Sequence, residues 1–272
     1  VEGAPTLVQV LRRDWFYFVP IAVLVWGVLK LDRPVFAGAI ACLALVPIGL
    51  VRNRSPRAFV ASIVAGLNNG MGQLVGVGIA CAVAGLVVGT LSMADLTGKI
   101  SSGMFTLAGG SYALTLLVAT VVIILLGMGM PTPAVYALSA VLAAPALLAL
   151  KIELLPAHLF IVYFASMSAI TPPVAVAAFA AASIARANPI AVAFVACRVG
   201  IVAFVLPLVF VNQPGLLLMG DAATVVTTIG FVLMGAMCLV IAFEGWLFGL
   251  VATPLRAALV VLPWLVRLRW VS

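Results

Sequence analysis

Two short stretches of the chain combine helix-breaking residues with oxygen-bearing side chains. They are Gly127–Pro133 (GMGMPTP) and Ser168–Pro173 (SAITPP), and both lie within very apolar regions. Proline cannot continue a helix, because it has no N–H and restricts the residue before it. A broken helix leaves carbonyl oxygens free at one end and N–H groups at the other, which suit Na⁺ and a carboxylate respectively. The sequence therefore predicts a binding site for small ions at these breaks.

The predicted ion site consists of neutral oxygens. Besides the carbonyls, hydroxyl oxygens come from Thr132, Ser166, Ser168 and Thr171. Such ligands fit a monovalent cation better than Ca²⁺ or Mg²⁺. We therefore predict a Na⁺ site at a hairpin tip and a helix break, with these candidate residues: Gly127, Gly129, Thr132, Ser168, Ala169, Thr171, Pro172 and Pro173. The alternative is a simple kink, because Pro and Gly are common in membrane helices.

Three further polar residues are candidates for substrate binding. Asn68 and Asn69 stand in a glycine-containing interruption that ends at Gln73, and they either line a substrate path or bond neighbouring helices. Arg198 lies within an apolar run, where an arginine is costly and often functional. It either binds a substrate carboxylate as a bidentate donor, or it snorkels or pairs with an acidic residue.

Three other titratable residues are expected to have structural roles. His158, the only histidine, is expected to be hydrogen-bonded. Glu244 is expected at an interface or in a scaffold, and Asp221 is expected to cap the helix that follows it. The sequence contains no Ser/His/Asp spacing, no phosphate-binding Gly-rich loop and no paired carboxylates, so we predict that the protein is not an enzyme.

The amino-acid composition indicates the class of protein in which these residues are positioned. Of the 272 residues, 66% are hydrophobic and 8% are charged, and the mean hydropathy is +1.35. A soluble domain carries about 25% charged residues, so the chain is predicted to be an integral membrane protein in a lipid bilayer. The net charge of +7 comes from basic residues near the ends of segments, such as Arg12, Arg13, Arg52, Arg54, Arg57, Arg267 and Arg269. This pattern is typical of positive-inside flanks and not of nucleic-acid binding.

The pattern of apolar runs predicts an all-α membrane protein with several spans. Residues 1–57 are expected to form scaffold-like spans, at Trp15–Leu29 and Val35–Val51. Residues 58–73 are expected to form a connecting arm, Ala58–Leu67, and a polar break. Residues 74–189 hold the region with a discontinuous helix and a re-entrant hairpin, whose arms of roughly a dozen residues are too short to cross a bilayer. Residues 190–272 are expected to form C-terminal spans and a tail, with Pro254–Trp270 as a last span or a surface helix. Because the chain starts at Val1, we expect a fragment or a processed product.

The stretch GMGMPTPAVYALSAVLAAPALL, followed by LLPAHLFIVYFASMSAITPPVAVAAFAAASIARANP, resembles the large membrane subunit of the tripartite ATP-independent periplasmic (TRAP) transporters. The likeness is to the fused permeases, covers about Trp15 to Pro214 and is most specific between Gly127 and Pro189. It implies an elevator-type carrier with two inverted repeats. On that pattern, Ser168–Pro173 matches the second hairpin tip, Gly127–Pro133 matches the break in the paired helix, and Ala58–Leu67 matches the connecting arm. Only one Pro-Pro tip is present, so the chain resembles the second repeat and the C-terminal tail: half of the carrier.

The resemblance implies a permease component of a Na⁺-coupled transporter in a bacterial inner membrane, which imports organic anions such as carboxylates or amino acids. The implied partners are a periplasmic substrate-binding protein, the small membrane subunit and the first repeat. Two alternatives stay open at this point: a dicarboxylate symporter that needs no binding protein, and a non-coupled channel or scaffold subunit.

Overall fold

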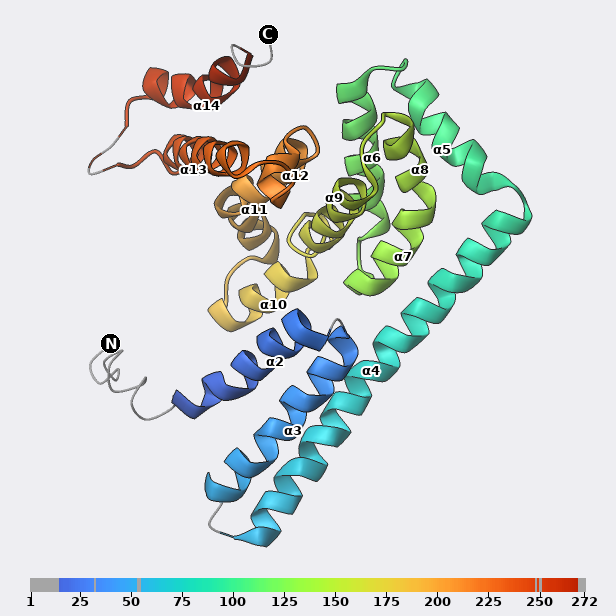
Figure 1. The fold of residues 1–272 in the computed structure, drawn as a ribbon, viewed down its shortest axis with the longest axis vertical. Coiled ribbons are helices and arrows are strands. Elements are labelled where there is room, and N and C mark those ends of the chain that lie inside the picture. Colours follow the sequence, from blue (N-terminus) through green and yellow to red (C-terminus); the bar gives the residue numbers. More distant parts are fainter. Residues whose placement is uncertain (1–14, 32, 53–54, 248, 250, 269–272) are drawn as a thin grey trace. The chain divides into compact units, whose positions relative to one another are not determined.

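The described part of the chain is built of helices joined by turns and contains no strand, as predicted for an all-α protein. The computed structural model describes residues 15–31, 33–52, 55–247, 249 and 251–268 (Figure 1). Arg12, Arg13, Arg54 and Arg269, which were assigned to basic flanks, lie outside these residues. The elements are η1 (Trp15–Tyr17), α2 (Phe18–Leu31), α3 (Pro34–Arg52), α4 (Pro56–Met93), α5 (Leu96–Leu107), α6 (Tyr112–Leu126), α7 (Thr132–Leu142), α8 (Ala144–Ala149), α9 (Leu154–Met167), α10 (Val176–Ala185), α11 (Pro189–Val199), α12 (Ile201–Phe210), η2 (Pro214–Leu217), α13 (Ala222–Glu244) and α14 (Thr253–Leu268).

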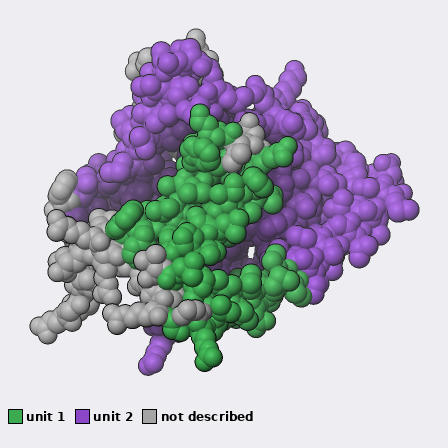
Figure 2. Space-filling model, turned by 60° about the horizontal axis from the view of Figure 1, so that its bottom comes forward, with its two compact units in different colours: residues 1–75 green, residues 76–272 purple. Residues whose placement is uncertain are grey.

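The chain divides into two compact units, residues 1–75 and residues 76–272 (Figure 2). The first unit contains η1, α2, α3 and the beginning of α4. Helices α2 and α3 pack against each other, and Ala37 and Ala41 of α3 are buried. The spans predicted at Trp15–Leu29 and Val35–Val51 are confirmed as helices.

Helix α4 corrects one prediction. The sequence suggested a short arm, Ala58–Leu67, followed by a break at residues 68–73, but α4 runs without interruption from Pro56 to Met93. Glycine keeps its N–H and costs about 1 kcal/mol relative to alanine in a helix, whereas each backbone group left unpaired in hydrocarbon costs several kcal/mol. Continuing the helix through Gly70 and Gly72 is therefore cheaper than breaking it.

A second difference concerns residues 92–111. By composition, Ser92–Ser102 is a polar stretch and Phe105–Leu126 is one apolar run. In the structure the turn is confined to Ala94 and Asp95, and α5 begins at Leu96. A second turn separates α5 from α6, where Gly109 and Gly110 have φ values of 58° and 72°. Left-handed backbone of this kind favours glycine. The glycine pair therefore indicates a turn, although the run around it is apolar throughout.

The core of the second unit surrounds α9. Helix α9 packs against α6, α7, α8 and α12. Its side chains Phe160, Ile161 and Phe164 are fully or almost fully buried, together with Ile123 of α6 and Phe210 of α12. The rings of Phe160 and Phe164 meet edge to face at 4.7 Å, a favourable arrangement for aromatic pairs. This core fixes the ends of α6 and α9, which carry the two predicted breaks.

The predicted short arms are confirmed, since α9 has 14 residues and α10 has 10. Helix α10 folds back on α11, with an angle of 116° between the two helices, and Ala175, Ala178 and Ala193 are buried between them. The packing partner of α10 is therefore α11.

Within the described part, Arg57–Met93 and Ala222–Glu244 are long and apolar enough to cross a membrane, and the bent pair α10–α11 gives a third candidate if it counts as one span.

One prediction for the C-terminal helices is confirmed. Asp221 caps α13, because its carboxylate accepts a hydrogen bond from the Thr224 N–H at 3.2 Å. Helix α14 has 16 residues and packs against α13. Within the described residues, α14 is not among the helices long and apolar enough to cross a membrane. Whether Pro254–Trp270, whose last two residues lie outside the described part, is a last span or a surface helix stays a prediction.

Candidate functional site

The first predicted break separates α6 from α7. Helix α6 ends at Leu126, where the Gly127 N–H still bonds the carbonyls of Ile123 and Ile124. Gly129 then adopts a φ of 81°, which a residue with a side chain rarely adopts. Pro131 has an extended conformation and precedes the first residue of α7. The five residues from 127 to 131 thus form a non-helical link between two helix ends.

The second predicted break separates α9 from α10. Helix α9 ends at Met167, and residues 168–175 form a compact tip that contains a cis peptide bond between Pro172 and Pro173. The Ala177 N–H bonds the Ala169 carbonyl at 2.9 Å and closes the tip on itself. The Thr171 hydroxyl donates to the Met167 carbonyl at 2.8 Å. The tip is therefore ordered by its own hydrogen bonds.

The two breaks meet. The hydroxyl of Ser168 is shared between the Gly127 carbonyl, at 3.1 Å, and the Ala165 carbonyl, at 2.7 Å. Ser168 is 2% exposed. A Cβ on Gly127 would lie 2.5 Å from the Ser168 Cβ and would overlap its Oγ. A glycine at position 127 is therefore required by the approach of Ser168, which lies 41 residues further along the chain.

The two breaks also approach each other at Gly129. A Cβ built on this glycine would lie 3.7 Å from Cγ1 of Val174 in the tip. The other candidate residues of the ion site lie near these contacts along the chain: Thr132 begins α7, and Ala169, Thr171 and Pro172 are half-buried in the tip, while Pro173 is exposed. The structure thus brings the two predicted breaks together.

The meeting point favours a cation electrostatically. Gly127 follows the C-terminal end of α6, and Ser168 follows the C-terminal end of α9. The C-terminal end of a helix carries a partial negative charge of about half an elementary charge, because its last carbonyls lack partners in the helix. Two such ends meet at this point. The oxygens that the structure places here are carbonyls and the hydroxyls of Ser168 and Thr171, all of which are neutral.

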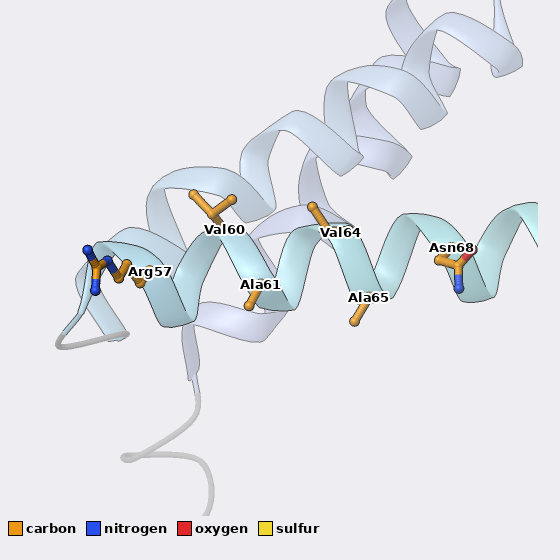
Figure 3. Close-up of a pocket in the computed structure, with 6 residues that line it drawn as sticks. All are labelled: Arg57, Val60, Ala61, Val64, Ala65 and Asn68. Carbon is orange, nitrogen blue, oxygen red and sulfur yellow. The ribbon is translucent and has the colours of Figure 1, made fainter.

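The candidate substrate residues Asn68 and Asn69 belong to the first unit, whereas the two breaks belong to the second. Both are exposed on α4, in the first unit. Asn68 lines an open hollow of about 750 Å³, and Figure 3 shows that the side chains around it come from a single helix: Arg57, Val60, Ala61, Val64, Ala65 and Asn68. The polar pair is part of a continuous helix and not of a break.

Arg198 is bound by the C-terminal end of α13. Its guanidinium donates to the carbonyl of Phe243, at 3.0 Å, and to the carbonyl of Glu244, at 3.2 Å. It also lies 3.5 Å from the Glu244 carboxylate. This is pairing with an acidic residue, one of the two alternatives that the sequence left open. A substrate contact of Arg198 stays a prediction.

Arg256 of α14 binds the same helix end from another element. Its Nε donates to the Ala242 carbonyl at 2.7 Å, and its Nη2 donates to the Phe243 carbonyl at 3.2 Å. Cations at a helix C-terminus are stabilised by the helix dipole. Two arginines thus cap α13. The scaffold role expected for Glu244 stays a prediction.

His158 also has a structural partner. Its Nδ1 lies 3.0 Å from the hydroxyl of Tyr136, and the two rings pack edge to face with centroids 6.0 Å apart. The pair connects α9 to α7. The predicted hydrogen-bonded role of His158 is confirmed.

Sequence reasoning missed a third interruption near the tip. Gly200 separates α11 from α12, and a Cβ on it would lie 3.3 Å from Cδ1 of Ile170. The Cys197 thiol lies 3.4 Å from the Ile170 carbonyl. The only sequence signal was a single glycine in an apolar run, without a proline beside it.

The arrangement described above, in which helix breaks meet inside an apolar helical protein, is typical of secondary transporters. A comparison with protein families matches residues 2–225 to the family described as "Tripartite ATP-independent periplasmic transporter, DctM component". The chain therefore belongs to this family, whose members are membrane components of transporters and not enzymes. A comparison with curated proteins and one with solved structures found no match.

Family membership indicates the class of the protein and its location in a membrane. The chain is a multi-pass membrane protein and a TRAP transporter permease component. The family implies association with a periplasmic binding protein and a small membrane subunit. The resemblance to the TRAP large membrane subunit, drawn from residues 127–189, is confirmed.

Proposed function

We propose that this chain forms part of a Na⁺-coupled permease that imports organic anions, delivered by a periplasmic binding protein, across a bacterial inner membrane. One observation carries the proposal: Ser168 of the tip donates to the Gly127 carbonyl and holds two broken helices together at their C-terminal ends. Family membership supports the transport role.

The cation would be held by the neutral oxygens of the two breaks. The carbonyls at the ends of α6 and α9 carry partial negative charge, and Thr171 adds a hydroxyl that already lies in the tip. A bound Na⁺ reduces the repulsion between the two negative helix ends. The tip is then stabilised in the arrangement that keeps Ser168 against Gly127.

The anion would bind at the other ends of the same breaks. The N-terminal ends of α7 and α10 follow residues 127–131 and 168–175, and they present N–H groups and partial positive charge. A carboxylate is the group that such ends favour. Because Na⁺ orders the broken backbone that both ligands share, its binding raises the affinity for the anion, and the reverse holds to the same extent.

The test is uptake into proteoliposomes that contain the gene product in which this chain occurs, with its membrane partners. A cognate binding protein loaded with a carboxylate is supplied outside, with and without a sodium gradient. The proposal predicts uptake that requires both. Uptake without sodium would refute the coupling, and uptake that the binding protein does not stimulate would favour a simpler symporter.

Thr171→Ala tests the ion site itself. Removal of the hydroxyl is expected to raise the sodium concentration for half-maximal uptake roughly fivefold, because one neutral ligand or hydrogen bond contributes about 1 kcal/mol. Thr227→Ala is a matched control, since Thr227 of α13 donates to the Ala223 carbonyl at the same 2.8 Å and four residues back. An unchanged sodium dependence in Thr171→Ala would remove Thr171 from the site.

A further inference from the structure

The C-terminal helices α13 and α14 lie mostly outside the residues that match the family. The match ends at Val225, in the first turn of α13. Helix α13 packs against α11 and α12, which follow the tip in the chain, and α14 packs against α13. Family membership alone gives this helix pair no role, so its role must be inferred from its contacts.

These contacts include a junction of three helices at the C-terminal end of α13. Arg198, in the last turn of α11, donates to the carbonyls of Phe243 and Glu244, at 3.0 and 3.2 Å. Arg256 of α14 donates to the carbonyls of Ala242 and Phe243, at 2.7 and 3.2 Å. The oxygen of Phe243 thus accepts from both arginines. Two helices that are separate in the chain, α11 and α14, are therefore joined through the same helix end.

Main-chain hydrogen bonds contribute more to this junction than the ion pair does. The last carbonyls of a helix lack partners within the helix and carry partial negative charge, so a guanidinium is a favourable donor to them. The Arg198 guanidinium lies further from the Glu244 carboxylate, at 3.5 Å, and the two side chains are 50% and 46% exposed. Exposed ion pairs contribute little, because water screens them. Arg198 therefore holds α13 chiefly through its backbone.

Arg198 lies within two residues of both contacts between α11 and the tip. The thiol of its neighbour Cys197 donates to the Ile170 carbonyl at 3.4 Å. Two residues after Arg198, a Cβ on Gly200 would lie 3.3 Å from Cδ1 of Ile170, so the Ile170 side chain packs closely on this glycine. The end of α11 is thus bound to the tip by residues 197 and 200 and to α13 by residue 198.

We propose that Arg198 is a positioning residue for the tip, and that α13 is the support to which it binds the end of α11. The last turn of α11 ends at the Gly200 interruption, so the helix does not continue to hold it. Without Arg198 this turn moves more freely, and Ile170 leaves its packing surface more often. In this role Arg198 acts through α11 and does not need to touch the transported substrate. The inference depends neither on the coupling ion nor on the anion, so its failure is separate from that of the proposed function.

Hydrogen exchange of the full chain in nanodiscs, measured by mass spectrometry, tests this role. In Arg198→Gln, we expect the amides of residues 168–177 to exchange roughly two- to tenfold faster than in the wild type, the effect of one typical hydrogen bond on a local opening. Amides of residues 158–164 should keep their rates, because this part of α9 is buried in the core with α6, α7, α8 and α12.

Two further variants separate the main-chain bonds from the charge. Arg198→Lys keeps the positive charge and a donor for one carbonyl, so it is expected to restore part of the protection of the tip. Glu244→Gln removes only the carboxylate, so it is expected to leave exchange in the tip unchanged. Arg186→Gln is the matched control. Arg186 is an exposed arginine in the turn before α11, and its side chain makes no hydrogen bond or ion pair with the described residues.

Alkylation of the Cys197 thiol gives a second readout that does not depend on amide exchange. The thiol is partly buried and bonded to the tip, so loss of this contact exposes it to a maleimide. The assay uses a background in which the other three cysteines are alanine: Cys42, Cys81 and Cys238. Arg198→Gln is expected to raise the rate of alkylation roughly two- to tenfold in this background, and Arg186→Gln is expected to leave it unchanged.

The inference is supported if exchange accelerates in the tip but not in the α9 core, and if Arg198→Lys recovers part of the protection. Unchanged exchange of the tip in Arg198→Gln would refute the positioning role. Equal acceleration in the tip and in the α9 core would also refute it, because it would show a general loss of stability. If Glu244→Gln accelerates exchange as much as Arg198→Gln, the ion pair and not the backbone of α13 holds α11, and the proposed support is wrong.

Discussion

The contact between Gly127 and Ser168 leads to a quantitative prediction for Gly127→Ala. The new methyl would lie 2.5 Å from the Ser168 Cβ and 3.2 Å from the Ile123 carbonyl. Overpacking of this kind costs about 1–3 kcal/mol, and the displaced Ser168 hydroxyl loses a hydrogen bond worth about 1 kcal/mol. Together the two effects lower the free energy of unfolding by about 2–4 kcal/mol. Relaxation recovers little of this loss, because Ser168 is buried.

Thermal unfolding in detergent measures this loss. We expect the midpoint of Gly127→Ala to fall by roughly 5–10 °C, on the scale that relates midpoint to stability in domains of this size. Gly230→Ala is the control, because Gly230 lies on α13 and nothing lies within 4 Å of the position of its Cβ. Uptake by Gly127→Ala should also be strongly reduced, since the two breaks no longer meet as they do in the wild type.

A compensating change makes the reasoning refutable. Ser168→Gly removes both atoms that the new methyl would overlap. The double variant Gly127→Ala/Ser168→Gly is therefore expected to be more stable than the sum of the two single changes predicts, by at least about 1 kcal/mol in a double-mutant cycle. If Gly127→Ala is as stable as Gly230→Ala, or if the two changes add, the breaks do not pack against each other as described.

Two other predictions concern the ends of α13. Arg256→Gln is expected to release α14 and to speed proteolysis between α13 and α14, because charged hydrogen bonds to the Ala242 and Phe243 carbonyls contribute about 1.5–3 kcal/mol; equal cleavage rates would contradict this capping role. At the other end, the hydrogen bond from the Thr224 hydroxyl lowers the pKa of Asp221. The lowered pKa contributes stability that is present above the unfolded value of about 3.9 and is lost as the pH falls through the folded value. Between about pH 5 and pH 3, the midpoint temperature of thermal unfolding should therefore fall more steeply in the wild type than in Asp221→Asn. Parallel curves of midpoint against pH would refute the effect.

Local chemistry explains why the two breaks were predictable. Pro131 and Pro133 in one stretch, and Pro172 and Pro173 in the other, remove N–H donors wherever the chain places them. The interruption therefore depends little on the rest of the fold. Asp221 was predictable for the same reason, because an N-cap is satisfied by N–H groups two or three residues away.

Single glycines were not predictable in the same way. Gly70 follows two asparagines and still continues helix α4, whereas Gly200 lies between Val199 and Ile201 and ends a helix. The feature that distinguishes Gly200 is distant in sequence, because Ile170 packs against it. The role of Arg198 depended on such a partner too, because its acceptors lie 45 and 46 residues away at the end of α13. Tertiary contacts of this kind leave no local pattern.

The hydrogen bonds at the tip have donors and acceptors of different kinds. The donors are the side chains of Ser168, Thr171 and Cys197, and the acceptors are main-chain oxygens of Gly127, Met167 and Ile170. A main-chain oxygen is the same whatever residue carries it. Substitutions can therefore accumulate at an acceptor position such as Met167 without altering the acceptor, while a donor position tolerates only another donor. In a library of random variants, we therefore expect the fewest tolerated substitutions at the three donor positions and at Gly127, where a Cβ would overlap Ser168. An acceptor position such as Met167 should tolerate many substitutions.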